Sequence, residues 1–341
     1  MKKSTAGTVL ALCLAFACFV TATAAAGEAA GTDKLLVYLS GPEAMLTALE
    51  TGFEESRGDV ADFLIMSCGE VRSKVWTEKE AGEIQADVIW GSDPLIYNML
   101  DAEGLLCDVS GIENAAAIAQ EFATDHNYLL VNERYIAIIY NSEALTGDDV
   151  PTSLDDLLDA KYANKLVMAD ATQSSTALGI ASCFYQLKGI GYLEGLEANG
   201  MMLTKSNGQV PSLILEGQYD VGIAPHDAVI RLSNKAKKEG YELALKIAWP
   251  SEGAIAIRRP VAIIQNDERS EDKQTLAEEL VNYLLSKQAQ TITAKYGFVS
   301  VRTDIENTVL PDGVEKVVID WEEASETQEE LKTLYEQIFQ N

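Results

Sequence analysis

The sequence predicts an α/β protein with mostly parallel sheets flanked by helices. Two observations indicate this class. Short apolar segments alternate with helical segments early in the chain, and each apolar segment ends at a loop rich in Gly and Ser. Parallel strands need crossover connections, and these are usually helices. A chain of 341 residues can also form two lobes, each with a core of its own.

The first lobe is expected to begin with three strand–helix units. The predicted strands are Leu35–Leu39, Val60–Ile65 and Ala86–Trp90. A helix over residues 43–56 follows the first strand, because its apolar side chains recur at helical spacing. Further helices are expected over residues 70–79 and up to residue 103.

The second lobe is expected between two crossings of the chain. Tyr135–Tyr140 is predicted to lead out of the first lobe, and Ala254–Ile257 and Val261–Ile264 are predicted to return to it as two strands. An amphipathic helix over residues 327–339 ends the chain. The expected boundaries are residues 1–26 for a leader, 33–136 with 261–341 for lobe 1, and 137–260 for lobe 2.

The first residues have the pattern of a secretory signal peptide. Lys2 and Lys3 precede a short apolar core, and small residues over 21–26 suit a signal peptidase. The apolar core is too short for a good membrane span. We therefore expect a periplasmic or extracellular protein. The run before Cys18 also resembles a weak lipidation box, so lipid anchoring at Cys18 is an alternative.

The charge balance is strongly acidic. The chain has 26 Lys and Arg against 53 Asp and Glu, a net charge of −27. Such a protein is a poor partner for nucleic acid, and most of this charge is expected on a solvated surface. An acidic protein can still bind an anion, because helix dipoles and a few donors determine the local field.

Three cysteines follow the leader, namely Cys68, Cys107 and Cys183. They are widely spaced and form no CxxC pair, so neither a zinc site nor a redox motif is expected. One disulfide with a free thiol is possible, and three buried thiols are the favoured alternative. No cofactor is predicted.

Hydroxyl and glycine residues mark the ends of the predicted strands, where helices begin. Free N–H groups at a helix N-terminus, together with hydroxyls, form a ready anion site. The candidate ligand-binding residues of this kind are Ser40, Gly41, Ser67, Gly69, Ser92, Thr172, Ser174, Ser175, Thr176 and Ser206. The alternative is that these residues only cap helices.

Two further candidates follow the apolar strand Tyr219–Ile223. That strand runs into His226 and Asp227, at the carboxyl end where open α/β sheets bind ligands. Replacing either residue with Ala is expected to weaken binding by about 1–3 kcal/mol. The alternatives are a structural histidine and an aspartate that caps the next helix.

Four blocks of residues resemble the ferric-ion and sugar-phosphate branch of bacterial ABC-transporter solute-binding proteins. They are Val37–Gly41, Gln85–Asp93, Asp170–Ala177 and Gly222–Asp227, the last followed by Trp249–Gly253 and Tyr296–Phe298. The resemblance implies a type II periplasmic-binding-protein fold, in which two lobes joined by two hinge strands close over a ligand. It also implies a monomer that docks on an ABC permease complex in the inner membrane.

The resemblance favours a small anionic ligand, either a sugar phosphate or an organophosphonate. His226, Asp227 and Glu252 resemble the polar set that holds sugar hydroxyls in hexose-phosphate binders, although Glu252 could instead be a solvated turn residue. Iron-binding relatives have two adjacent tyrosines where this chain has Asp227 and Ala228. Hard Fe³⁺ prefers more anionic oxygen ligands than this register offers. Ferric iron therefore stands as the alternative ligand.

An enzyme is not expected. The nucleophile elbow, the P-loop and the H-E-x-x-H motif are all absent from the sequence. His226 beside Asp227 could form an acid–base pair, but the sequence places no nucleophile or cofactor next to it. A sensor or adhesin domain with the same fold, outside transport, is the remaining alternative.

Overall fold

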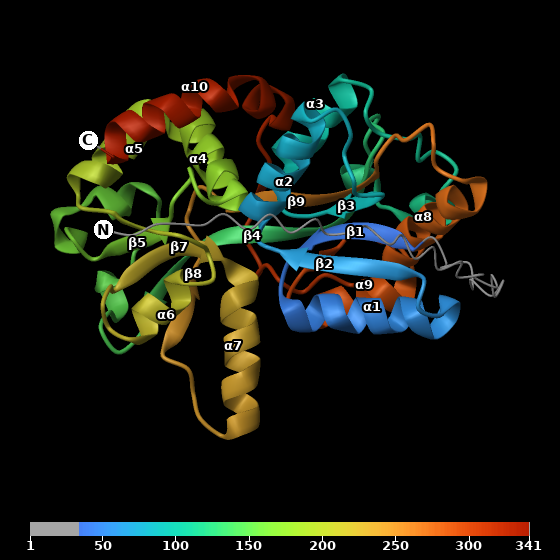
Figure 1. The fold of residues 1–341 in the computed structure, drawn as a ribbon. Helices are drawn as coiled ribbons and strands as arrows, with labels where there is room; N and C mark the ends of the chain where they lie inside the picture. The colour runs from blue at the N-terminus through green and yellow to red at the C-terminus, as the bar shows by residue number, and fades with distance from the viewer. Residues whose placement is uncertain (1–33, 341) are drawn as a thin grey trace, which may run out of the picture. The chain divides into compact units, whose positions relative to one another are not determined.

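The computed structural model describes residues 34–340, so the predicted leader and Cys18 lie outside the described residues. One sheet runs through this part of the chain, with its main strands in the order β2-β1-β3-β9-β4-β7-β5-β6 (Figure 1). The strands are β1 (Leu35–Ser40), β2 (Ala61–Met66), β3 (Val88–Trp90), β4 (Leu129–Asn141), β5 (Leu166–Ala169), β6 (Met202–Thr204), β7 (Val221–Pro225), β8 (Leu245–Ala248), β9 (Ala254–Ile263), β10 (Val299–Ser300) and β11 (Lys316–Val317).

Helices cover both faces of this sheet. They are α1 (Glu43–Arg57), α2 (Cys68–Glu80), α3 (Pro94–Ala102), α4 (Ser175–Lys188), α5 (Ile190–Ala198), α6 (Val210–Leu215), α7 (His226–Glu239), α8 (Glu271–Leu284), α9 (Lys287–Lys295) and α10 (Trp321–Phe339). The predicted α/β class, a sheet flanked by helices, is confirmed.

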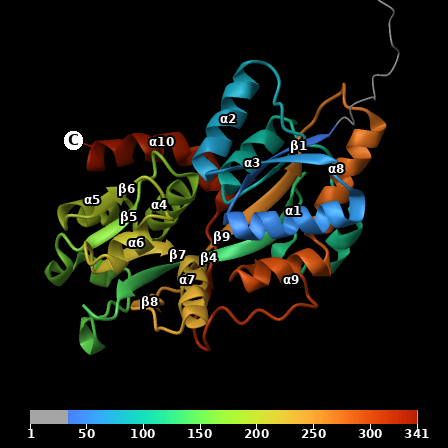
Figure 2. The same cartoon turned by 60° about the horizontal axis from the view of Figure 1, so that its bottom comes forward.

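The first half of the sheet is parallel where β1 lies between β2 and β3. Helices α2 and α3 cover one face, and α1 and α9 lie side by side on the other (Figures 1 and 2). The core includes Met45, Leu46 and Phe53 of α1, the apolar positions that predicted this helix.

The second half has β5 in parallel pairing with β6 and β7. This half has two hydrophobic cores. In the larger one, α4 and α5 pack against the strands through side chains such as Leu166, Ile180 and Leu196. Because parallel strands point the same way, the polar residues that follow β5 and β7 lie at one edge of the sheet. The segment that follows β5 contacts residues that follow β2 and β3.

The two halves are connected by the long antiparallel strands β4 and β9. The prediction divided β9 into two strands, and the structure makes it one. Pro260 has no N–H to donate and stands opposite Leu130, beside a shift of register before Asn132. A proline is tolerated at such an irregularity, so the strand continues through it.

Helix α10 packs into the second core, whereas the expected boundaries placed it in lobe 1. Leu331 and Tyr335 are fully buried there. Its N-terminal end also contacts α3, where Asn98 Nδ2 donates to the Trp321 carbonyl over 3.0 Å. The terminal helix therefore contacts the elements of both halves.

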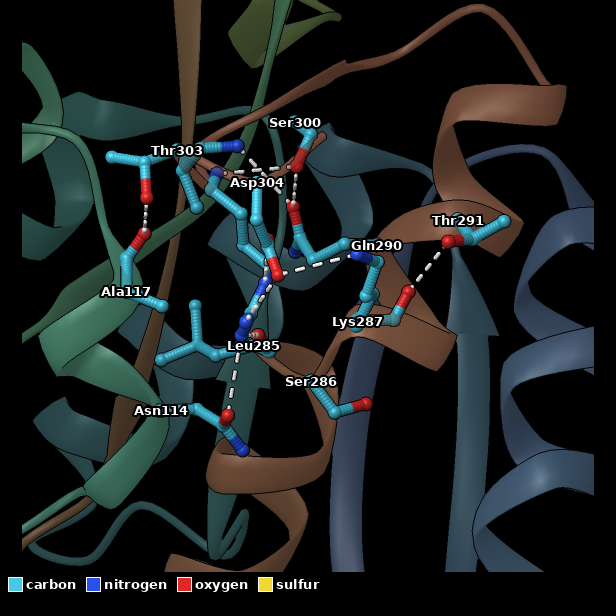
Figure 3. Close-up of polar contacts among 12 residues, drawn as sticks. Asn114, Ala117, Leu285, Ser286, Lys287, Gln290, Thr291, Ser300, Thr303 and Asp304 are labelled. Carbon is cyan, nitrogen blue, oxygen red and sulfur yellow. Dashed lines mark hydrogen bonds and ion pairs between the residues drawn. The ribbon is translucent and has the colours of Figure 1, made fainter. Parts of the chain in front are cut away.

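A buried glutamine fixes the segment that enters β10 (Figure 3). Gln290 Oε1 accepts from Ser300 Oγ over 2.7 Å, and its Nε2 donates to the Val131 carbonyl over 2.7 Å. These bonds connect α9, β10 and β4 in the interior, where Gln290 and Ser300 are fully buried. They hold the preceding residues Gly297 and Phe298 against the hinge strands.

The three described cysteines are free thiols. Cys183 is buried, whereas Cys68 and Cys107 are half-buried. The absence of a disulfide among the described cysteines agrees with the favoured alternative of three buried thiols, but that prediction is wrong in its burial, because only Cys183 lies in the core.

Candidate ligand-binding site

The two halves touch where α4 begins. Ser175 Oγ donates to the Cys68 carbonyl over 3.3 Å, and Thr176 Oγ1 donates to the Ser92 carbonyl over 3.3 Å. Gly69 lies against Gln173, because a β-carbon added at Gly69 would be 2.5 Å from the Gln173 carbonyl oxygen. The hydroxyl-rich start of α4 thus closes over the loops that follow β2 and β3.

The predicted caps are present at both helix N-termini. Ser67 forms a capping box with Glu70 at the start of α2. Ser174 Oγ accepts from the Ala177 N–H at the start of α4 and also from Asn207 Nδ2 over 3.2 Å. Capping of this kind orients the helix but leaves other N–H groups of the first turn unbonded.

Arg259 is the central cation beneath this contact, and its side chain is completely buried. Its guanidinium donates to the Ser40 carbonyl and, over 3.2 Å, to Asn132 Oδ1. It lies between the rings of Trp90 and Phe298, 4.6 and 4.7 Å from their centroids. Among residues 34–340 no carboxylate forms an ion pair with it.

The surroundings of Arg259 disfavour the charged form of its guanidinium. Burial, followed by repulsion from Arg134, lowers the pKa of Arg259 to about 10. Gly41 leaves room for the guanidinium, since a β-carbon there would lie 3.0 Å from Arg259 Nη2. A buried cation without a counter-ion is costly unless a charged partner joins it.

Several buried donors near Arg259 also lack partners within the described chain. They are Arg259 Nε, Asn132 Nδ2, Trp90 Nε1, Ser92 Oγ and the Tyr97 hydroxyl. Buried polar groups are nearly always hydrogen-bonded, so a cluster of unpaired donors needs an explanation. All of these groups can donate, which suits an anion.

A groove of about 740 Å³ opens between α2, α10 and the start of α4, and none of the five residues with unpaired donors lines it. Five sequence-predicted candidates line it, namely Ser67, Gly69, Thr172, Ser174 and Ser175. Two cationic and two acidic side chains also line it, namely Arg72, Lys332, Glu70 and Glu329, and Lys332 is paired with Glu329 over 2.7 Å. Arg72 is paired with Asp93 over 3.0 Å.

His226 lies at the expected strand end, but both of its ring nitrogens bind the backbone. Nε2 donates to the Gly297 carbonyl over 2.7 Å, and Nδ1 accepts from the Tyr135 N–H over 3.0 Å. The ring is fully buried, and burial lowers its pKa. The histidine therefore joins β7, β4 and the β10 segment, as in the structural alternative.

Asp227 is also buried, and two arginines occupy its oxygens. Arg134 Nε donates to Oδ1 over 2.8 Å, and Arg231 Nη1 donates to Oδ2 over 2.5 Å. Burial alone would raise the pKa of Asp227, but Arg134 and Arg231 outweigh it and hold the pKa below its usual value. In this conformation Asp227 has arginine partners on both oxygens.

Glu252 lies away from the other candidates. Its Oε2 accepts from the Leu154 N–H over 3.0 Å, and its Oε1 pairs with Lys188 over 2.7 Å. Lys188 is the last residue of α4, about 20 Å along the helix from Ser175 at 1.5 Å per residue. The structure brings Ser40, Gly41, Ser67, Gly69, Ser92 and Thr172–Thr176 together, but it does not bring Glu252 to them.

Ser206 is half-buried in the turn before α6, and its carbonyl accepts from the Gln209 N–H. Its neighbour Asn207 makes the bond to Ser174 described above. The contact between this turn and α4 is therefore made by Asn207.

The sequence interpretation missed Arg259, Asn132, Tyr97 and Cys68. A signal existed for the first of these, because Arg258 and Arg259 interrupt an otherwise apolar strand over Ala254–Ile263. An arginine in the middle of a buried strand needs a partner. No local pattern distinguishes Asn132, Tyr97 or Cys68.

Within residues 34–340 no three His, Cys, Asp or Glu side chains gather closely enough to hold a metal ion. None of the helices over the same residues is both long and apolar enough to span a bilayer.

The chain belongs to the family of bacterial extracellular solute-binding proteins, whose family model matches residues 85–327. A protein of Salmonella typhimurium, provisionally named as a 2-aminoethylphosphonate-binding periplasmic protein, is 29% identical over 238 residues. The match covers 67% of this chain and 66% of that relative. A Salmonella paratyphi A protein with the same provisional name matches equally. The matched region thus spans just under two thirds of these relatives.

Solved structures confirm the fold. The periplasmic binding protein AfuA of Actinobacillus pleuropneumoniae, with fructose-6-phosphate bound, superposes with a TM-score of 0.76 at 22% identity, over 90% of this chain and 98% of that chain. Iron-bound HitA of Pseudomonas aeruginosa gives 0.75 at 19% identity, over 89% and 99%. The predicted type II periplasmic-binding-protein fold and the predicted membership of a bacterial solute-binding family are confirmed.

Proposed function

We propose that this protein captures a small organic phosphonate or phosphate ester between its two halves and delivers it to an ABC permease. The observation that carries the proposal is Arg259, a fully buried guanidinium without a carboxylate partner in the described chain. An oxyanion of the ligand would supply the missing negative charge.

The chemistry of the surrounding groups supports an oxyanion over a metal cation. Guanidinium groups bind phosphate-like oxygens in bidentate geometry. Ser92 and Tyr97 offer hydroxyls without partners, and the N-termini of α2 and α4 add positive dipole ends nearby. A ferric ion would need several anionic oxygen ligands in the same place, and this cluster offers donors.

The names of the relatives favour a phosphonate. The Salmonella proteins named for 2-aminoethylphosphonate are 29% identical to this chain. A sugar phosphate is the second candidate, because AfuA was solved with fructose-6-phosphate. Ser40, Gly41, Ser67, Gly69, Ser92 and Thr172–Thr176 are proposed to contact the ligand together with Arg259. His226, Asp227 and Glu252 are proposed instead to hold the frame of the fold.

A thermal-shift and calorimetric screen tests the proposal. The purified protein is titrated with 2-aminoethylphosphonate, fructose-6-phosphate and ferric citrate. A true ligand at about 100 times its dissociation constant adds about 2.7 kcal/mol to the unfolding free energy. Stabilisation by ferric citrate alone would contradict the proposal.

Substitution of Arg259 tests the role of the buried cation. Arg259→Lys keeps the charge but loses bidentate geometry, so affinity for the phosphorus ligand should fall about tenfold or more. Arg269→Lys is the matched control, because Arg269 is almost as buried and is already paired with Asp87 over 3.1 Å. Equal affinity of the Arg259 variant and the wild type would remove Arg259 from the site.

We also propose that the protein works outside the cytoplasm, exported by the predicted leader, and that it binds its ligand without converting it. Incubation with each candidate ligand, followed by phosphorus NMR, should show an unchanged compound. Deleting the gene should abolish uptake of the ligand. Uptake that persists would favour the sensor role over transport.

A further inference from the structure

Cys68 places a thiol in the contact between the two halves. Its Sγ lies 2.9 Å from Ser40 Oγ in the first half and 3.5 Å from Thr176 Oγ1 of α4. Cys68 is the first residue of α2 and is half-buried. The thiol therefore connects the loop after β1 with the start of α4.

The groups without partners surround the same place. Ser92 Oγ is buried without a partner in the described residues, while the Ser92 carbonyl binds the Thr176 hydroxyl that also contacts Cys68. Arg259 Nε is unpaired as well, and Arg259 binds the carbonyl of Ser40, whose hydroxyl contacts the thiol. Cys68 thus contacts residues that also carry or bind the unpaired donors.

We propose that Cys68 is a ligand-contacting residue, with its thiol against the bound oxyanion and covered by α4 when the halves close. This inference rests on the proposed function. A thiol is a weak donor with a large, polarisable sulfur. Contact with the ligand, together with closure of α4, would shield it from solvent reagents.

Alkylation makes this shielding measurable. The Cys68 sulfur attacks the methylene carbon of iodoacetamide, a C–S bond forms, iodide leaves with the C–I electron pair, and the thiol proton goes to solvent. The added group fills the space next to Ser40 and Thr176. The alkylated protein should therefore lose most of its affinity for the ligand.

The chain contains its own control. Cys107 is also half-buried, but its Sγ lies 3.2 Å from Gln265 Oε1 on the far side of the first half. Alkylation rates of both cysteines are measured in one sample by peptide mass spectrometry, with and without saturating 2-aminoethylphosphonate. We expect Cys68 to react at least tenfold more slowly with ligand, and Cys107 to react at the same rate.

Two variants distinguish contact between Cys68 and the ligand from shielding of the thiol by closure alone. Cys68→Ser keeps a small donor and should bind within about threefold of the wild type, whereas Cys68→Ala should lose about threefold to tenfold. Cys107→Ala is the matched control and should bind like the wild type. Circular dichroism of each variant verifies that it is folded.

The outcomes distinguish the two proposals. Wild-type protein that binds no phosphonate or phosphate ester refutes the proposed function and this inference with it. Wild-type protein that binds, but whose Cys68 reacts equally fast with ligand, refutes this inference alone. Slower alkylation combined with unchanged affinity of Cys68→Ala shows shielding without contact and also overturns it.

Discussion

At the scale of single residues, buried charges divide into those with partners and those without. Asp227 has two arginine partners, and Arg259 has no carboxylate partner in the described chain. Both side chains are fully buried, so burial alone does not mark a binding residue. The missing partner is the observation on which the proposed ligand-binding role of Arg259 rests.

Replacing Asp227 should chiefly destabilise the fold. Asp227→Ala leaves Arg134 and Arg231 without their shared carboxylate, and breaking such a buried pair costs about 3–5 kcal/mol. Urea unfolding measures the loss. The control Asp304→Ala breaks a partly exposed pair with Arg302 and should cost under about 1 kcal/mol. A stable Asp227→Ala variant with weakened binding would restore Asp227 to the ligand site.

The buried histidine should make stability depend on pH. The folded pKa of His226 lies below its unfolded value of about 6.5, so the unfolded chain binds the proton first. The contribution is complete above about pH 6.5 and is lost as pH falls below that value. Asp227 and Arg134 are the charged groups that act on the ring.

Urea unfolding at pH 7.5 and pH 5.5 tests this dependence. The wild type should lose more unfolding free energy between the two pH values than His226→Gln does. The variant should be less stable than the wild type at pH 7.5, since it loses the backbone bonds of the ring. An equal loss in both proteins would contradict a neutral buried imidazole.

At the scale of elements, short-range patterns predicted most of the fold. The spacing of Met45, Leu46 and Phe53 was sufficient for α1, and the strands of the first half were found to within a few residues of their ends. Local sequence patterns did not predict the structural roles that depend on contacts between residues far apart in the chain. The partners of His226 at Gly297 and Tyr135 are 71 and 91 residues away, and α10 packs in the second core against α4 and α5, which lie much earlier in the chain.

Candidate site residues show the same limit. Serines at strand ends could be predicted, because the sheet itself collects them at one edge. Asn132 could not, since it lies within β4 near its beginning and becomes significant only because β9 places Arg259 opposite it. Cross-strand pairing is invisible in a single sequence.

Capping of α4 gives a prediction for an element. Ser174→Ala removes the bond to the Ala177 N–H and should cost about 0.5–2 kcal/mol of stability. Because this helix end is proposed to face the ligand, affinity should fall as well. Ser270→Ala removes the equivalent cap of α8, away from the groove, and should lower stability without changing affinity. Equal effects of both variants on binding would mean that α4 contributes only to the fold.

At the scale of the whole molecule, the halves share one sheet through β4 and β9, and α10 contacts both halves. Relative motion of the halves must therefore bend these strands and change the contacts of α10. The opposing surfaces are closed in this structure, with Gly69 packed on Gln173. Binding proteins of this class depend on a hinge equilibrium between open and closed forms. A residue that matters only in the closed form can therefore change affinity without changing the stability of either half.

Gly69→Ala perturbs this equilibrium. A β-carbon at Gly69 would meet the Gln173 carbonyl oxygen at 2.5 Å, so closure should be hindered. Alanine also favours the helix in which Gly69 lies, by up to about 1 kcal/mol. The ligand-free variant should unfold at the same or a higher temperature than the wild type, while its affinity falls about tenfold or more, because the closed state is less populated.

Small-angle X-ray scattering provides the decisive readout for Gly69→Ala. Saturating ligand should contract the wild type more than the variant. Gly111→Ala is the matched control, because a β-carbon at Gly111 meets no atom within 4 Å, and it should bind and contract like the wild type. Since Gly69 has no side chain to offer a ligand, a loss of affinity with unhindered contraction would show that the Gly69–Gln173 contact does not limit closure.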